Sequence, residues 1–189
     1  MYKALSLIIC MLLAPACGHG QKNQAPAAQA KTKLEAFQAR TGAVIVMGFS
    51  EVGTVQGKYG TSATVESREF TDASTGKKEY GITVEVKKEG TMESENTSYI
   101  DYDEVDSLIK GIDYISRADA SVTKLKHFEA DYRTKGDLEI STFSSGSGEI
   151  QAAVASGTIG GTRAFLSISK LGEFRNLIVN AKAGLDSVR

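Results

Sequence analysis

Residues 99–112, YIDYDEVDSLIKGI, decide the fold, because the spacing of apolar residues changes within them from that of a strand to that of a helix. From Val105 to Ile112 the apolar residues lie three or four positions apart, which places them on one helical face. The acidic residues just before them offer an N-cap, either Asp101 or Asp103, and their charge suits the positive end of the helix dipole. This stretch therefore predicts a strand that leads into a capped helix.

A second stretch shows the same change of spacing. FLSISKLGEFRNLI, residues 165–178, aligns with the first without a gap, at a constant offset of 66 residues. Phe165 falls on Tyr99, the cap candidate Ser167 falls on Asp101, and the apolar helix positions coincide. The identity between the two stretches is low. Two interpretations stay open, a duplicated unit and the ordinary appearance of any strand–cap–helix segment.

Before each predicted helix the apolar residues alternate, as they do in strands. In YGITVEVKK, residues 80–88, the apolar side chains share one face and the polar ones share the other. Turn signals such as STGKK, residues 74–78, separate these strands. The run GAVIVMGF, residues 42–49, is almost continuously apolar and predicts a strand buried on both faces. Strands in series with short turns imply antiparallel sheets.

The predicted fold class is therefore α+β, with antiparallel sheets and two helices that form a β4α unit twice. We expect one domain over residues 34–189, with halves at 34–117 and 122–187. The topology is similar to that of the Whirly and PUR families of single-stranded nucleic-acid binders, which repeat a β4α unit. The resemblance ends at topology, because the sequence has none of the basic and aromatic motifs that nucleic-acid binding needs.

The overall charge also argues against a nucleic-acid partner. The chain has 22 basic and 23 acidic residues among 189, and its net charge is −1. This balance gives no electrostatic footprint for nucleic acid or for an acidic membrane surface. The hydrophobic fraction of 41% is enough for a sizeable core.

Residues 1–16 have the features of an export signal. An apolar run of 10 residues, 4–13, is too short to span a bilayer, which needs about 20. It fits the apolar region of a secretory signal, and the small residues Ala14 and Ala16 follow it. Cleavage after Ala16 would remove Cys10 and leave Cys17 as the only cysteine, so no internal disulfide could form. The alternative interpretation of the run is a buried core helix.

The segment around Cys17 resembles a bacterial lipoprotein signal, and the resemblance implies that Cys17 is lipidated. Two positions depart from that pattern, because Ala14 stands where such signals usually carry Leu, and Pro15 is atypical. Cleavage without lipidation is the alternative. Residues 17–33 are polar and predict a flexible tether that reaches about 20–25 Å. The expected location is the bacterial cell envelope, with the membrane as a partner through the lipid anchor; otherwise the protein is secreted.

Few residues after the tether suit catalysis. His127 is the only histidine there and no cysteine remains, which excludes Cys–His chemistry. No GxSxG motif supports a Ser–His–acid site. We therefore expect no catalytic residue, metal or cofactor, and favour a non-enzymatic module that binds an unknown protein or small molecule. The alternative is an envelope enzyme that acts on glycans through paired carboxylates in a cleft.

Two polar clusters have a functional and a structural interpretation. His127, Glu129 and Asp131 share one face of a predicted strand, and a metal there would need a further ligand from elsewhere; we favour a solvated polar face. The run DYDEVD, residues 101–106, lacks the Gly and Glu of a calcium loop, so helix capping is favoured. Open strand edges would permit a homodimer.

Overall fold

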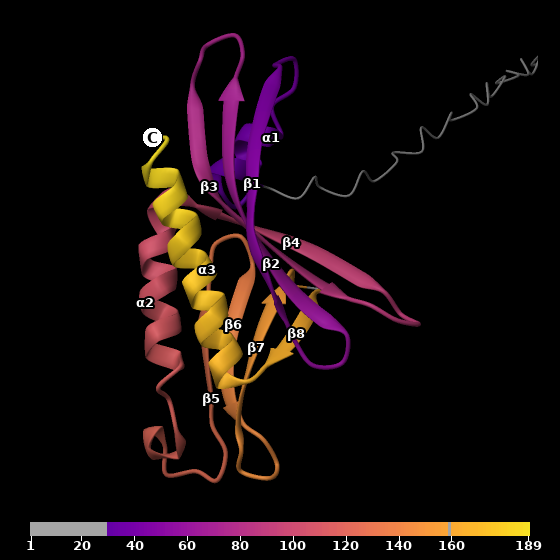
Figure 1. Cartoon of the computed structure of the whole chain (residues 1–189), viewed down its shortest axis with the longest axis vertical. Helices are drawn as coiled ribbons and strands as arrows, with labels where there is room; N and C mark the ends of the chain where they lie inside the picture. Colours follow the sequence, from indigo (N-terminus) through magenta and orange to yellow (C-terminus); the bar gives the residue numbers. More distant parts are fainter. Residues whose placement is uncertain (1–29, 159) are drawn as a thin grey trace, which may run out of the picture.

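The structure is a computed structural model that describes residues 30–158 and 160–189 (Figure 1). The predicted signal, and Cys17 with it, lie outside these residues. Eight strands form two antiparallel sheets, each of four strands in chain order. The first sheet contains β1 (Ile45–Gln56), β2 (Thr61–Asp72), β3 (Lys78–Lys88) and β4 (Ser94–Asp101), and the second contains β5 (Glu129–Arg133), β6 (Leu138–Ser144), β7 (Ile150–Ser156) and β8 (Thr162–Leu166).

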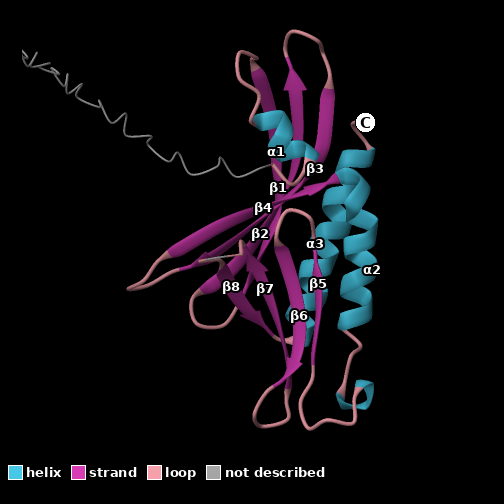
Figure 2. Cartoon of the chain, turned by 180° about the vertical axis from the view of Figure 1, so that it is seen from behind, coloured by secondary structure: helices cyan, strands magenta, loops and turns pink. Residues whose placement is uncertain are grey.

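A long helix follows each sheet, α2 (Val105–Ile115) after the first and α3 (Ile168–Asp186) after the second. The two helices lie side by side in both views (Figures 1 and 2). The prediction of an α+β fold with antiparallel sheets is confirmed. Beyond the two predicted helices, the structure has a short third one, α1 (Lys33–Gln38), and two single turns, η1 (Tyr102–Glu104) and η2 (Ala120–Val122).

Both sheets and both long helices contribute to one hydrophobic core. The apolar positions that predicted the helices are the ones buried, which confirms the helical spacing in both stretches. A fully buried Leu or Ile contributes about 1.5–3 kcal/mol relative to an exposed one. The largest fully buried side chains of this core are Ile82, Ile100, Leu108, Ile112, Leu138, Ile140, Leu166, Leu171, Phe174 and Ile178.

The short helix α1 covers the opposite face of the first sheet and lies apart from the α2–α3 pair (Figure 2). Its Leu34 and Phe37 pack on Phe70 of β2, and the ring of Tyr99 borders them. A capping box between Thr32 and Glu35 begins the helix. Thr32 and Lys33, which the predicted tether includes, thus belong to this helix and its cap.

The predicted cap of α2 is wrong, because Asp101 caps α1 instead. The Asp101 carboxylate accepts from the backbone N of Lys33 at 2.9 Å and of Leu34 at 3.1 Å. The chain turns through η1 before α2 begins, so the side chains of Asp101 and Asp103 make no cap bond there. The second predicted cap is confirmed, since Ser167 accepts from the backbone N of Lys170.

The prediction of a strand buried on both faces at residues 42–49 is also wrong. These residues enter β1, which is the edge strand of the first sheet. Val46 is 56% exposed and Phe49 is 68% exposed. The reason lies in the packing, because α1 rests mainly on β2, β3 and β4, and Leu177 of α3 meets β1 at Gly53, which lies beyond the exposed residues.

Candidate functional site

Three aromatic rings form a row on the outer face of the second sheet, the face turned away from α2 and α3. Phe143 of β6 and Phe165 of β8 alternate with buried residues and therefore point away from the core. The ring centroids of Phe143 and Phe165 lie 6.5 Å apart, and those of Phe165 and Tyr59 lie 6.2 Å apart. Both pairs are close to perpendicular, at 82° and 79°. We call Tyr59, Phe165 and Phe143 the aromatic row.

The row is open because, in the part of the chain that the structure describes, no element on the second sheet corresponds to α1. Phe165 aligns with Tyr99 in the two matched stretches, and both residues lie on the outer face of their sheet. On the first sheet, α1 covers this place with Leu34 and Phe37. Within the described residues, no helix covers the equivalent place on the second sheet, and Phe165 stays half-buried.

Tyr59 reaches the row from the turn between β1 and β2, with its backbone in an unfavourable conformation. Its φ is +60° and that of Gly60 is +69°, and the backbone N of Thr61 donates to the Lys58 O at 3.3 Å. A turn with two left-handed central residues favours Asn-Gly or Asp-Gly. A left-handed conformation costs a residue with a bulky side chain about 1–2 kcal/mol. Burial does not offset this cost, because Tyr59 is 78% exposed.

A backbone hydrogen bond holds the turn against the second sheet. The N of Lys58 donates to the O of Phe165 at 2.8 Å, so the turn pairs with the outer edge of β8. The β1–β2 connection of the first sheet thereby extends the outer face of the second sheet. Tyr59 is placed beside Phe165 by this contact, and the site combines residues from both halves of the chain.

Two hollows of about 480 and 380 Å³ adjoin the row and share Arg163 and Phe165. On the same face of the sheet, the small residues Ser141 and Ala153 pair across β6 and β7, and each is only 1% exposed. Glu139 accepts from Arg163 at 2.9 Å and also pairs with Arg133. The first hollow is lined further by His127, Phe128, Glu129, Phe143 and Ser144, and the second by Tyr59, Thr61, Lys88, Ser94, Gly161 and Thr162.

The residues of the predicted polar cluster lie at and beside this site. His127 and Glu129 line the first hollow, and Asp131 lies farther along the same exposed face of β5. In the described part of the chain, no three His, Cys, Asp or Glu side chains come close enough to hold a metal ion. The DYDEVD acids make structural contacts, since Asp103 pairs with Lys33 at 2.6 Å and Asp106 lies 3.8 Å from Lys182.

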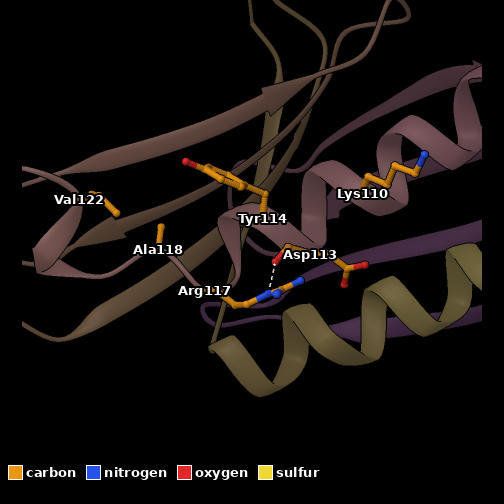
Figure 3. Close-up of a pocket in the computed structure, with 6 residues that line it drawn as sticks. All are labelled: Lys110, Asp113, Tyr114, Arg117, Ala118 and Val122. Carbon is orange, nitrogen blue, oxygen red and sulfur yellow. Dashed lines mark hydrogen bonds between the residues drawn. The ribbon is translucent and has the colours of Figure 1, made fainter.

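A separate hollow of about 490 Å³ lies where α2 ends (Figure 3). Asp113 forms a two-pronged ion pair with Arg175 of α3, at 2.5 and 2.9 Å. The Arg175 guanidinium holds the pKa of Asp113 below its usual value. We call this site the α2 hollow, and it is lined by Lys110, Asp113, Tyr114, Arg117, Ala118 and Val122.

Three carboxyl groups gather on the outer face of the first sheet, where the sequence analysis predicted no site. Burial raises the pKa of Glu85, and the neighbouring charges of Glu95 and Glu66 raise it further. Glu66 bonds to Arg68, and Glu95 is exposed. The group lies on an open strand face, whereas a glycan-cleaving pair of carboxylates needs a cleft.

Comparison of the chain with protein-family models, with curated proteins and with solved structures found no match. Among the described residues, no helix is long and apolar enough to cross a membrane. The sequence analysis missed the aromatic row because its three rings come from three separate segments. The one available signal was Gly60 directly after Tyr59, since glycine is common in tight turns.

Proposed function

We propose that this chain is a non-enzymatic binding module of the bacterial cell envelope, and that its aromatic row holds a glycan chain. The observation that carries the proposal is Tyr59, a large side chain kept exposed on a left-handed backbone. Strained backbone of this kind persists where function requires it. A ligand that packs on the ring would offset a cost that the folded protein alone does not recover.

The chemistry of the row suits sugar rings. A pyranose has apolar C–H faces and a rim of hydroxyl groups, so it needs both aromatic and polar partners. Tyr59 and Phe165 offer the aromatic surface, and Arg163, His127 and Glu129 offer donors and acceptors beside it. The two hollows meet at Phe165, which supports a chain of several sugar rings over a single one.

We propose further that Cys17 carries a lipid after export and that residues following it tether the domain to the membrane. This proposal rests on the sequence of residues 1–33 alone. Replacement of the cysteine, Cys17→Ser, should leave an unprocessed precursor and abolish labelling by a radioactive fatty acid. Normal processing of the variant, with release of soluble protein, would show that the chain is secreted without an anchor.

Co-sedimentation with purified peptidoglycan sacculi tests the glycan proposal. The full chain should sediment with the sacculi, and Tyr59→Asn should reduce the bound fraction about tenfold, the effect of losing roughly 1.4 kcal/mol of aromatic contact. Tyr114→Asn is the matched control, because Tyr114 is 75% exposed but lies outside the row. Absence of binding by the parent chain, or an equal loss in both variants, would refute the proposal.

An envelope enzyme that acts on glycans is the second candidate, and the observation that favours it is the gathering of Glu85, Glu66 and Glu95 on one face of the first sheet, where burial raises the pKa of Glu85. This function requires Glu85 to exchange a proton with a glycosidic oxygen. The full chain would then release soluble sugar fragments from sacculi, and Glu85→Gln would stop the release. If neither protein releases fragments while the parent chain sediments, the binding function stands alone.

A further inference from the structure

We propose a second ligand site, which does not depend on the aromatic row: the α2 hollow binds an amphipathic anion. Such a ligand has an apolar chain or ring and a single carboxylate, sulfate or phosphate group. The proposal rests on the charge, the apolar wall and the size of the hollow.

The charge of the hollow is positive and not compensated by the chain itself. Lys110 and Arg117 line it, and its one acid, Asp113, is held by Arg175. The Arg117 Nε donates to the backbone O of Asp113 at 2.8 Å, which fixes the guanidinium at the end of the helix (Figure 3). Within the described ranges, no carboxylate forms an ion pair with Lys110 or Arg117. An anionic group would therefore find an available cation at either end of the hollow, Lys110 or Arg117.

The wall of the hollow is apolar, and its two large side chains are exposed. Tyr114 is 75% exposed and Val122 is 55% exposed, and Ala118 lies between them (Figure 3). Tyr114 comes from α2 and Val122 from η2, so the wall spans two elements. Large apolar side chains at a concave place with polar groups beside them are typical of ligand sites. The apolar part of the ligand would lie against this wall.

The size of the hollow favours a small amphiphile. Ligand pockets in proteins measure about 300–1,000 Å³, and this one measures about 490 Å³. It accommodates one short chain or ring next to an anionic group. The same chemistry has two sources, a free carboxylate such as a fatty acid and the edge of an anionic bilayer.

Titration of the ¹⁵N-labelled full chain with octanoate, followed by amide chemical shifts, tests this site. Octanoate should shift the signals of residues 110–122, and Lys110→Gln should raise its Kd about threefold to tenfold, the usual effect of losing one charge-assisted contact. Lys124→Gln is the matched control, because Lys124 is also exposed and lies just after η2 but does not line the hollow. Octanol should bind more weakly than octanoate, and acetate should cause no comparable shifts.

Vesicles of anionic phosphatidylglycerol distinguish the two sources of the ligand. Binding to vesicles that is lost with Lys110→Gln would support the site and assign it to the bilayer, and binding of octanoate alone would support a free amphiphile. Equal affinity for octanol, equal shifts with acetate, or an equal loss in Lys124→Gln would each overturn the proposal. Circular dichroism should show that both variants keep the fold, since both lysines are exposed.

Discussion

At the scale of single residues, Tyr59 links backbone strain to the proposed function. Its left-handed conformation serves the turn between β1 and β2, yet Asn or Gly would serve that turn better. The ring gains only an edge contact with Phe165 and remains mostly exposed. A residue that served folding alone would have a favourable backbone conformation or a well-packed side chain, and Tyr59 has neither.

We therefore expect Tyr59→Asn to stabilise the protein while it weakens ligand binding. The free energy of unfolding should rise by about 0.5–1 kcal/mol, because Asn tolerates the left-handed region. Urea denaturation measures the change, and Tyr114→Asn should be close to neutral. A loss of more than about 1 kcal/mol in Tyr59→Asn would identify Tyr59 as a packing residue.

The Asp72 carboxylate stabilises the turn between β2 and β3, and its protonation should make this turn sensitive to acid. Its Oδ1 accepts from the Ser74 hydroxyl at 2.6 Å and from the backbone N of Ser74 and Thr75, at 2.9 and 3.2 Å. Arg40 bonds to its Oδ2 at 3.0 Å. The bonds from Ser74 do most to lower the pKa of Asp72, from 3.8 to about 2.

A carboxyl group whose pKa is lowered by folding stabilises the folded state at pH values above its pKa in the unfolded chain. This stabilisation is lost as the pH falls through the pKa that the group has in the folded protein. For Asp72 this loss falls between pH 3.8 and about 2. Asp72→Asn keeps an acceptor oxygen but removes the titration. Its free energy of unfolding should therefore fall less steeply than that of the parent chain between pH 4 and 2, as measured by urea denaturation. Parallel curves for the two proteins would contradict the assignment.

At the scale of elements, two helical glycines have opposite surroundings. A Cβ on Gly111 of α2 would lie 2.3 Å from the ring of Tyr132, which packs there from β5. A Cβ on Gly172 of α3 would have no neighbour within 4 Å. Gly111 has a low helix propensity, but the absence of a side chain there lets the ring of Tyr132 pack closely against α2.

We expect Gly111→Ala to destabilise the protein by about 1–3 kcal/mol, because crowding against the ring outweighs the better helix propensity. Gly172→Ala should stabilise it by about 0.5–1 kcal/mol, because propensity acts there alone. Thermal unfolding of the two variants compares these effects directly. Stabilisation by both substitutions would mean that Tyr132 moves aside freely.

The edge strand β1 is the element on which we base the proposed homodimer. The Val44 O accepts from the Ala73 N, and bonds to β2 alternate along the strand, so Ile45, Met47 and Phe49 present their backbone groups at the open edge. Residues 45–50 carry no charge and no proline, the usual protections of an edge. Antiparallel pairing centred on Met47 would place Ile45 against Phe49 of a second copy.

The parent chain should therefore sediment as a dimer at tens of micromolar, and Met47→Lys should sediment as a monomer. Two lysines would then meet at the centre of the paired strands, and like charges directly opposite each other destabilise a sheet. Analytical ultracentrifugation measures both states. A monomeric parent chain, or a dimer that survives the substitution, would remove the homodimer from the account.

At the scale of the whole molecule, the spacing of apolar residues predicts the sheets and the long helices. It does not predict how these elements contact one another. The alternating runs and the two helical stretches are local patterns, and the sheets and long helices follow them. The cap that Asp101 gives to α1 joins distant parts of the chain, so no local pattern reveals it. The exposed face of β1 depends on where α1 and α3 end, which the apolar run itself does not encode.

The candidate site shows the same limit. Phe143 and Phe165 were predictable as strand residues, but their exposure arises because no helix among residues 30–158 and 160–189 covers the second sheet as α1 covers the first. Tyr59 meets them only because the β1–β2 turn pairs with β8. A sequence pattern specifies the face of a strand on which a side chain lies, and the assembly of two sheets decides whether that face is covered.

Glycan binding by the aromatic row is tested most directly by titration of the ¹⁵N-labelled full chain with a soluble tetramer of N-acetylglucosamine. We expect amide shifts around Tyr59, Phe143 and Phe165, saturable binding, and a loss of about tenfold in affinity in Tyr59→Asn but not in Tyr114→Asn. Shifts confined to another surface, or the same affinity in Tyr59→Asn as in the parent chain, would contradict it.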